Sequence, residues 1–268
     1  MLEVFLINKQ LTSCSNGQIT VGCASRIIAN GHLPLSKALY PKAMFPYMNP
    51  IALFDFDKTI INKDTGLSFI LYALKRNSLR YFFAFLITPI SFLFLLSNKT
   101  RFIGNSIYLW LATVGLTKSG VQELRTNFIN HYVNSPEIII YKDALIKIEG
   151  HLEQGHQVLI ISGSSTWMVE GIIKTIDVPK LQVLGSDEQR LFGGMVSSFH
   201  CFEKNKVKIL DKVLNLNEYT QIFGYSDSSA DIPLLSICHK KYVINPSKRS
   251  LIKFKKAFKT EITVLNWV

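Results

Sequence analysis

Short runs of consecutive apolar residues alternate along this chain with longer segments in which apolar residues recur every three or four positions. The short runs are typical of strands buried on both faces of a parallel sheet, and the longer segments of helices that cover it. The pattern therefore predicts an α/β fold with a Rossmann-like parallel sheet. A hairpin with a turn of paired glycines is expected at 191–196. The predicted strands are 51–56, 157–162, 181–184, 221–225 and 241–244.

Two aspartates stand at the end of the first predicted strand, Asp55 and Asp57. Clustered carboxylates repel one another and are costly to desolvate unless a cation offsets their charge. A bound Mg²⁺ would be such a cation. A turn or a helix cap explains the same aspartates, so this segment alone leaves the choice open.

Two other predicted strands, 157–162 and 221–225, also end in residues that could bind a ligand. Ser162 and Gly163 end the run at 157–162, where a hydroxyl and a backbone N–H can hold phosphate oxygens. Asp227 follows the run at 221–225, with Asp231 one helical turn beyond. Capping residues would look the same in each place. Because the carboxyl ends of parallel strands share one edge of a sheet, the four residues are expected there together.

Lysines crowd the start of a predicted helix at 204–214, whose apolar face is Val207, Leu210, Val213 and Leu214. A lysine at a helix N-terminus is electrostatically misplaced unless it faces an anion. A solvated basic face explains Lys204 and Lys208 better than it explains all three lysines. Spacing alone does not identify the lysine that would face an anion.

These four segments, in this order, resemble the haloacid dehalogenase-like (HAD) superfamily of Mg²⁺-dependent phosphatases, in the branch that includes phosphoserine phosphatase. The segment Gly224-Tyr-Ser-Asp-Ser228, Asp231 before Pro-Leu-Leu, and Cys201 ahead of Lys206 look like bacterial phosphatidylglycerophosphatase C. The resemblance covers the chain from about Met48 onward. Lys58 departs from it, since many relatives carry glycine there.

The resemblance implies a mechanism and a set of roles. Asp55 would attack phosphorus and form an aspartyl-phosphate, and Asp57 would act as general acid and base. Asp231 would orient Lys206 or a metal-bound water. The implied metal site for Mg²⁺ is Asp55, Asp57 through its backbone carbonyl, and Asp227; the implied phosphate-binding residues are Ser162, Gly163 and Lys206.

An unusually apolar insertion separates the first two motifs, and it bears on the substrate class. Residues 48–65 and 135–268 form the expected catalytic core, and 66–134 an inserted helical cap with an apolar hairpin at about 78–116. Three interpretations compete: a hairpin lying in the membrane interface, a cap with a soluble core, and a two-pass membrane hairpin. Pro89 interrupts the first apolar stretch and the second is short for a span, which favours the interfacial hairpin.

The net charge of +11, from 30 Lys and Arg against 19 Asp and Glu, fits an anionic membrane surface. No nucleic-acid module is recognisable, so no nucleic acid is expected as a partner, and no obligate protein partner is evident. The expected substrate is the phosphate monoester of a phospholipid headgroup, phosphatidylglycerophosphate, at a bacterial inner membrane with the core facing the cytoplasm. The alternatives are a cytoplasmic soluble phosphatase of the phosphoserine type, with Arg125 as one candidate selector, and an inactive membrane-binding module.

The first 47 residues differ in composition from the rest. Scattered Gly, Ser, Asn and Pro give this segment little to pack, and it lacks the pattern of a secretory signal. We expect residues 1–47 to be disordered or a non-native extension, with the functional chain beginning at Met48. The four cysteines lack Cys-x-x-Cys spacing, which favours a reducing compartment.

Overall fold

The central strand of the fold is β1, which has four apolar residues that are all buried. The structure is a computed structural model that describes residues 49–97, 100–176 and 181–268. The expectations for residues 1–47 and for a start at Met48 lie outside the described residues. The strands are β1 (Ile51–Phe54), β2 (Gln157–Ser165), β3 (Gln182–Leu191), β4 (Gly194–Phe199), β5 (Ile222–Ser226), β6 (Lys240–Ile244) and β7 (Ile262–Leu265).

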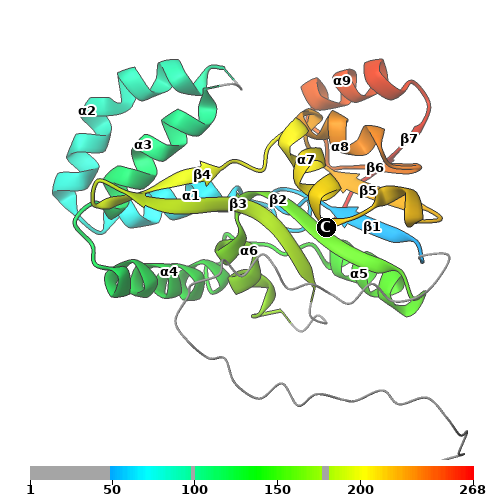
Figure 1. Cartoon of the computed structure of the whole chain (residues 1–268), viewed down its shortest axis with the longest axis horizontal. Coiled ribbons are helices and arrows are strands. Elements are labelled where there is room, and N and C mark those ends of the chain that lie inside the picture. Colours follow the sequence, from blue (N-terminus) through cyan, green and yellow to red (C-terminus); the bar gives the residue numbers. More distant parts are fainter. Residues whose placement is uncertain (1–48, 98–99, 177–180) are drawn as a thin grey trace, which may run out of the picture. The chain divides into compact units, whose positions relative to one another are not determined.

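The strands form one sheet in the order β4-β3-β2-β1-β5-β6-β7 (Figure 1). All neighbouring pairs are parallel except β3 and β4, which are antiparallel. Phe54, the last residue of β1, pairs with Ile160 on one side and Tyr225 on the other. The predicted α/β fold with a Rossmann-like sheet is therefore confirmed, and the order of connection reverses between β1 and β5.

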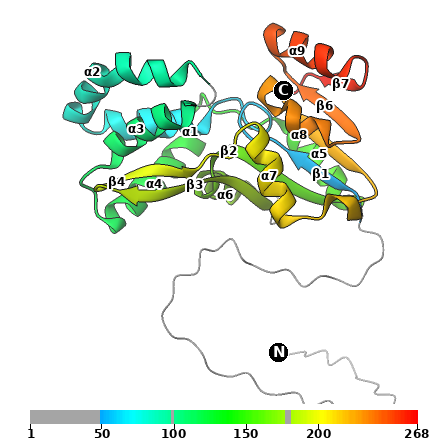
Figure 2. The same ribbon diagram turned by 45° about the horizontal axis from the view of Figure 1, so that its top comes forward.

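Helices cover both faces of the sheet, as Figure 2 shows. Alternate residues of β1 point to opposite faces, so Ala52 and Phe54 join one hydrophobic cluster while Ile51 and Leu53 join the other. The first cluster packs under α1, α4, α5 and α6, and the second under α7, α8 and α9. The helices are α1 (Thr65–Lys75), α2 (Ser78–Leu95), α3 (Arg101–Thr113), α4 (Lys118–Val133), α5 (Lys142–Glu153), α6 (Thr166–Ile173), α7 (Lys204–Val213), α8 (Ile232–Ser236) and α9 (Lys248–Phe258).

Several strand boundaries differ from the predictions. β1 ends at Phe54, because the chain then turns and the Ile60 N–H donates to the Phe56 carbonyl at 2.8 Å. β2 and β3 run past their predicted ends, because Ser165 of β2 still pairs with Ser186 and β3 goes on to pair with β4 from Asp187 to Leu191. The edge strand β7 was not predicted, because its burial depends on pairing with β6.

The predicted hairpin is present, but its turn is not made by the paired glycines. Phe192 and Gly193 occupy the turn with φ of 45° and 80°, while Gly194 begins β4. Phe192 is 86% exposed, so its ring does not hinder the turn. A Cβ on Gly194 would lie 2.6 Å from Trp110 Cδ1, so close packing of α3 explains this second glycine.

Helices α1 to α4 occupy the span between β1 and β2 that was assigned to the cap. Pro89 lies inside α2 and does not end it, which corrects the expected interruption. Arg80 donates to the carbonyl oxygens of Ala112 and Val114 at 2.5 and 2.7 Å. Its charge therefore stabilises the C-terminal end of α3.

Candidate active site

The loop after β1 carries Asp55 and Asp57 beyond the end of the strand. The Asp55 N–H still donates to the Tyr225 carbonyl at 2.9 Å, which fixes the start of the loop against β5. Lys58 follows with φ of 61°, a left-handed conformation that favours glycine. A glycine would adopt this left-handed conformation without strain. Lys58 adopts it at a cost of about 1 kcal/mol.

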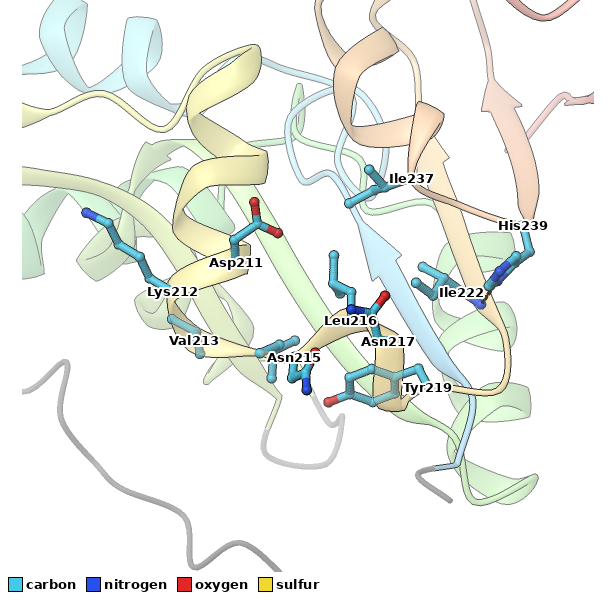
Figure 3. Close-up of a pocket in the computed structure, with 11 residues that line it drawn as sticks. Asp211, Lys212, Val213, Asn215, Leu216, Asn217, Tyr219, Ile222, Ile237 and His239 are labelled. Carbon is cyan, nitrogen blue, oxygen red and sulfur yellow. Dashed lines mark hydrogen bonds between the residues drawn. The ribbon is translucent and has the colours of Figure 1, made fainter. Parts of the chain in front are cut away.

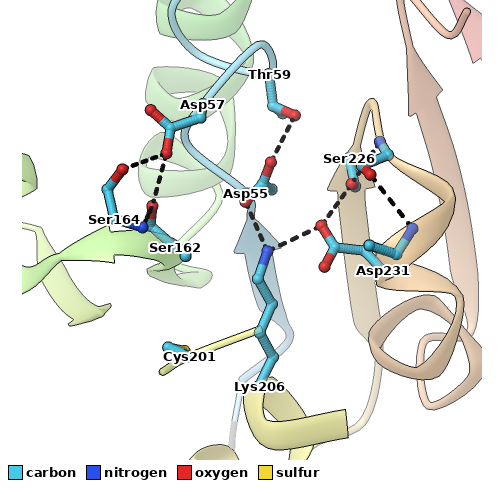
Figure 4. Close-up of polar contacts among 12 residues, drawn as sticks. Asp55, Asp57, Thr59, Ser162, Ser164, Cys201, Lys206, Ser226 and Asp231 are labelled. Atoms are coloured by element: carbon cyan, nitrogen blue, oxygen red, sulfur yellow. Dashed lines mark hydrogen bonds and ion pairs between the residues drawn. The ribbon is translucent and has the colours of Figure 1, made fainter. Parts of the chain in front are cut away.

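Lys206, on the first turn of α7, lies between two aspartates (Figure 4). Its Nζ is 2.6 Å from Asp55 Oδ1 and 2.8 Å from Asp231 Oδ2, and all three side chains are buried. Burial opposes the charge on the lysine, but the two carboxylates outweigh this effect and raise the pKa of Lys206. The ammonium group is therefore retained at neutral pH. Lys204 and Lys208 are exposed, so the structure distinguishes the three lysines.

Thr59 and Ser226 complete the hydrogen bonding around these carboxylates, and neither was named as a site residue. Thr59 Oγ1 donates to Asp55 Oδ2 at 3.2 Å and accepts the Asp227 N–H at 3.0 Å. Ser226 Oγ donates to Asp231 Oδ2 at 2.7 Å. The Asp-x-Asp-x-Thr spacing was a usable signal for Thr59, whereas Ser226 had none beyond its place at a strand end.

Asp57 lies on the β2 side of Asp55. Its Oδ1 accepts the Thr65 N–H at 2.7 Å, and its Oδ2 accepts Ser164 Oγ at 2.6 Å and Ser162 Oγ at 3.3 Å. Burial raises the pKa of Asp57, while the hydrogen bonds from Ser164 and Thr65 oppose that rise. A carboxyl group with a raised pKa is suited to proton transfer near neutral pH.

A bulge in β2 explains why its serines reach Asp57. Between two paired positions β2 advances four residues, Ile161 to Ser165, while β3 advances two, Leu184 to Ser186. The extra residues leave the pairing and re-aim their side chains, as bulges do beside many sites. Sequence analysis found Ser162 but missed Ser164, because a bulge cannot be read from an apolar run.

Gly163 lies in this bulge, and its carbonyl accepts Ser186 Oγ at 2.6 Å. An added Cβ would meet the Cys201 carbonyl oxygen at 3.7 Å and Phe202 Cδ2 at 3.9 Å, both ordinary contacts. Neither neighbouring atoms nor a left-handed φ requires glycine here. The free space above the residue would admit a ligand oxygen close to the backbone.

The carboxylates at this edge suit a divalent cation. Asp55 and Asp231 contact the ammonium of Lys206, and Asp227 lies near the charges of Lys58 and Lys206. Burial, reinforced by the charge of Asp231, raises the pKa of Asp227 to about 7. Among the described residues, no three His, Cys, Asp or Glu side chains are grouped to hold a metal. The ligand set inferred from the sequence needs only two carboxylates and one backbone carbonyl, so it does not depend on such a group and stays a prediction.

Arg125, the candidate selector of a soluble substrate, is already paired. Its Nη2 is 2.7 Å from Glu188 Oε2, and its guanidinium lies 4.8 Å from the Trp167 ring centroid. Glu188 also accepts hydrogen bonds from Trp167 Nε1 at 2.9 Å and from Ser165 Oγ. Arg125 therefore joins α4 to β3.

A cavity of about 810 Å³ lies at the opposite end of the sheet (Figure 3). It is lined by the end of α7, by the segment before β5 and by His239. The His239 ring accepts the Ile222 N–H at 2.9 Å, so it is engaged in holding the start of β5. None of the predicted site residues lines this cavity. The size of a cavity alone therefore does not identify the active site.

Residues 52–236 match the family model of the haloacid dehalogenase-like hydrolases. The chain belongs to the haloacid dehalogenase-like hydrolase family. This match spans every aspartate, serine and lysine described above. Family membership and this site identify the chain as a phosphatase of the HAD family.

Two curated relatives are each 24% identical to this chain. One is the "inhibition of morphological differentiation protein" of Streptomyces azureus, over 205 residues that cover 74% of this chain and 72% of the relative. The other is a probable phosphatase of Mycobacterium tuberculosis, over 213 residues that cover 78% of this chain and 73% of the relative.

Solved structures share the fold at lower identity. A Bordetella pertussis protein of unknown function has a TM-score of 0.62 at 17% identity, covering 80% of this chain and 98% of its own. A phosphoserine phosphohydrolase-like protein from Francisella tularensis has a TM-score of 0.53 at 15% identity, covering 81% and 95%. These similarities show a shared fold.

Proposed function

We propose that this HAD phosphatase removes the phosphate monoester from a glycerolipid headgroup, converting phosphatidylglycerophosphate to phosphatidylglycerol and inorganic phosphate. The observation that carries the proposal is the exposed apolar surface of α2. Only Ala84 and Ser91 of its 18 residues are buried, and no charged residue follows Arg80. An apolar patch of this kind marks an interaction surface. The apolar hairpin surface is defined here as Leu79, Phe82, Phe83, Phe85, Leu86, Ile90, Phe92 and Leu93.

Length and packing favour insertion into one leaflet over two crossings. Among the helices of the described residues, α2 alone is long and apolar enough, by length and composition, to cross a membrane. α3 has 13 residues, fewer than the roughly 20 that a span needs. α3 is also attached to the β3–β4 hairpin, since Thr113 Oγ1 accepts the Met195 N–H at 2.8 Å and Trp110 Nε1 donates to the Leu191 carbonyl at 3.0 Å. A helix bound to the sheet cannot cross separately.

The surroundings of the hairpin suit an anionic membrane. Lys75 and Arg76 are exposed where α1 leads into α2, and the whole chain carries a net charge of +11. Cations beside an inserted apolar surface are attracted to anionic headgroups. The proposed location is the bacterial inner membrane, with the catalytic core facing the cytoplasm.

The reaction uses the groups at the ends of β1, β2 and β5. The Asp55 carboxylate attacks phosphorus in line and forms an aspartyl-phosphate, while Asp57 donates its proton to the leaving alkoxide. Asp57 then takes a proton from water that hydrolyses the intermediate. Lys206 neutralises charge on the equatorial oxygens of the phosphoryl group. Ser162 and the Gly163 N–H orient those oxygens, and Asp231 holds Lys206 in place.

Asp55, Asp227 and the Asp57 carbonyl would hold Mg²⁺. When bound, Mg²⁺ screens the repulsion between the nucleophile and the phosphate and stabilises charge on the phosphoryl oxygens. A soluble phosphatase of the phosphoserine type remains the alternative. It is less well supported, because Arg125 is paired with Glu188. An inactive membrane-binding module fits poorly with an intact set of reacting groups.

A phosphate-release panel tests the substrate. Full-length protein with Mg²⁺ in detergent micelles is given phosphatidylglycerophosphate, phosphatidic acid, phosphoserine and a nucleotide. We expect the highest kcat/KM with phosphatidylglycerophosphate. A higher kcat/KM with phosphoserine would overturn the lipid assignment and support the soluble alternative.

Membrane attachment is tested by fractionation. Apolar insertion is not screened by salt, so the protein should stay with membranes in high salt. Replacing Phe83, Phe85, Phe92 and Phe94 by Ser should release it, whereas replacing exposed Lys118 by Ser should not. Full solubility of the wild type without detergent would contradict the inserted hairpin.

A further inference from the structure

Three side chains form a wall beside Gly163 that the reaction above does not use. His200 and Phe202 lie between β4 and α7, and Arg101 is the first residue of α3 in the cap. The His200 and Phe202 rings are stacked with centroids 5.4 Å apart, and the Arg101 guanidinium lies 5.6 Å from the Phe202 centroid. Phe202 Cδ2 would lie 3.9 Å from a Cβ built on Gly163. The wall therefore adjoins the proposed phosphate site.

The imidazole of His200 presents an unused hydrogen-bonding atom. Its Nε2 is buried and has no hydrogen-bond partner in the described part of the chain. Its Nδ1 is 3.4 Å from Ser186 Oγ, which already donates its one proton to the Gly163 carbonyl and accepts the Cys201 N–H. His200 must therefore donate from Nδ1, which leaves the Nε2 lone pair as an acceptor.

His200 is suited to remain a neutral acceptor. Burial lowers its pKa, and the positive charges of Arg101 and Lys206 lower it further, while Asp64 acts in the opposite direction. A buried acceptor without a donor carries a desolvation penalty. A hydroxyl group on a ligand would supply the missing donor.

Arg101 presents an unused cation. No hydrogen bond or ion pair to its guanidinium is found among the described residues, and its side chain is half-buried over Phe202. Arg125, another arginine of the cap beside an aromatic ring, is paired with Glu188. A partly desolvated guanidinium that has no anion can bind a phosphate group strongly.

We infer that His200 and Arg101 form the subsite for the leaving group of a lipid phosphomonoester: His200 Nε2 accepts a hydroxyl of the headgroup glycerol, and Arg101 binds the phosphodiester beyond it. This inference rests on the proposed function and makes it more specific. The glycerol of phosphatidylglycerophosphate carries a free hydroxyl between its monoester and its phosphodiester. Phosphatidic acid has neither group, so the subsite selects between the two lipids.

The test uses the full chain in mixed micelles with phosphatidylglycerophosphate, its analogue lacking the glycerol hydroxyl, phosphatidic acid and soluble p-nitrophenyl phosphate. Arg101→Met keeps the apolar stem, His200→Phe keeps the stacked ring, and Lys118→Met removes a cap charge elsewhere. Thermal unfolding checks that each variant is folded.

Arg101→Met should lower kcat/KM for phosphatidylglycerophosphate about 10- to 100-fold, the usual value of a hydrogen bond to a charged group. Its effect on phosphatidic acid and p-nitrophenyl phosphate should stay within about threefold, and Lys118→Met should change nothing. His200→Phe should lower kcat/KM about tenfold for phosphatidylglycerophosphate and leave the analogue without the hydroxyl unaffected.

Equal losses on phosphatidic acid would overturn the inference, because they would indicate a general effect on the site. Full turnover of phosphatidylglycerophosphate by both variants would overturn it while leaving the proposed function intact. Wild-type protein that cleaves p-nitrophenyl phosphate but not phosphatidylglycerophosphate would instead refute the proposed function, and the subsite with it.

Discussion

Replacing Lys206 by Met should destabilise the protein and abolish turnover, while the same change at Lys208 should do neither. Lys206 Nζ contacts Asp55 at 2.6 Å and Asp231 at 2.8 Å, and the three side chains are buried. Methionine has a similar length, so packing is largely kept. The loss of the ammonium leaves two buried carboxylates facing each other without an internal cation.

Removing one partner from a buried ion pair typically lowers the free energy of unfolding by about 3 to 5 kcal/mol. For a domain of this size each kcal/mol changes Tm by about 2 to 4 °C, so Tm should fall by roughly 6 to 20 °C. Lys208 is exposed on the same helix, and its replacement should change the free energy of unfolding by less than about 0.5 kcal/mol. Both effects should be measured by urea unfolding in EDTA, because a bound cation would take over part of the lysine's role.

The pH dependence tests the electrostatic reason. Burial already raises the folded-state pKa of the Asp55 carboxyl group, and the charge of Lys206 opposes that rise, so loss of the ammonium should raise this pKa further. The folded state of the variant then binds more protons, so its stability deficit against wild type should shrink as the pH falls from 7 to 5. A deficit below about 1 kcal/mol at pH 7, or one that grows on acidification, would refute this account.

Three further outcomes are expected. Asp55→Asn should abolish phosphate release while Tm is retained, because an amide is a poor nucleophile; near wild-type turnover would exclude the aspartyl-phosphate. Gly163→Ala should keep Tm within about 2 °C but raise KM for every phosphate ester, since its Cβ meets only ordinary contacts in the fold; unchanged kinetics would place phosphate elsewhere. Burial lowers the pKa of His151 to about 4, so below pH 6.5 the unfolded state binds its proton more tightly. The stability of wild type relative to His151→Gln should therefore fall by at most about 3 kcal/mol between pH 6.5 and 4, measured by urea midpoints.

The two histidines near β2 show how a single backbone angle changes an expectation. His151 and His156 are five positions apart and would not share a helix face, so helical spacing does not bring them together. Gly155 has φ of 73° and turns the chain back, which brings the two Nδ1 atoms to 2.8 Å. His151 also contacts the Tyr225 hydroxyl at 2.8 Å, inside the core. A glycine often ends a helix, but the pairing of the two histidines depends on the path of the chain after α5.

The sheet and the polar residues at its edge could be predicted from the sequence, because both follow from residue type and spacing. Apolar runs of strand length have to be buried, and the polar residues that end them have to leave the sheet at one edge. This reasoning selected Asp55 and Asp57 after β1, Ser162 near the end of β2, and Asp227 directly after β5. It could not find the ends of β2 and β3 or the β2 bulge, because those depend on what the neighbouring strand offers.

The sequence by itself determined the α/β class, the order of the motifs and the apolar character of the hairpin, since these follow from residue type and spacing. The family resemblance pointed to Lys206, but only the tertiary structure showed that its ammonium contacts Asp55 and Asp231 and that α3 is bound to β4. Lys206 meets Asp55 across 151 positions of chain, and Ser164 meets Asp57 across 107. Val213 was predicted on the apolar face of α7, but in the structure it is 42% exposed. Contacts between such distant residues depend on how helices and strands pack, and packing is a property of the whole fold.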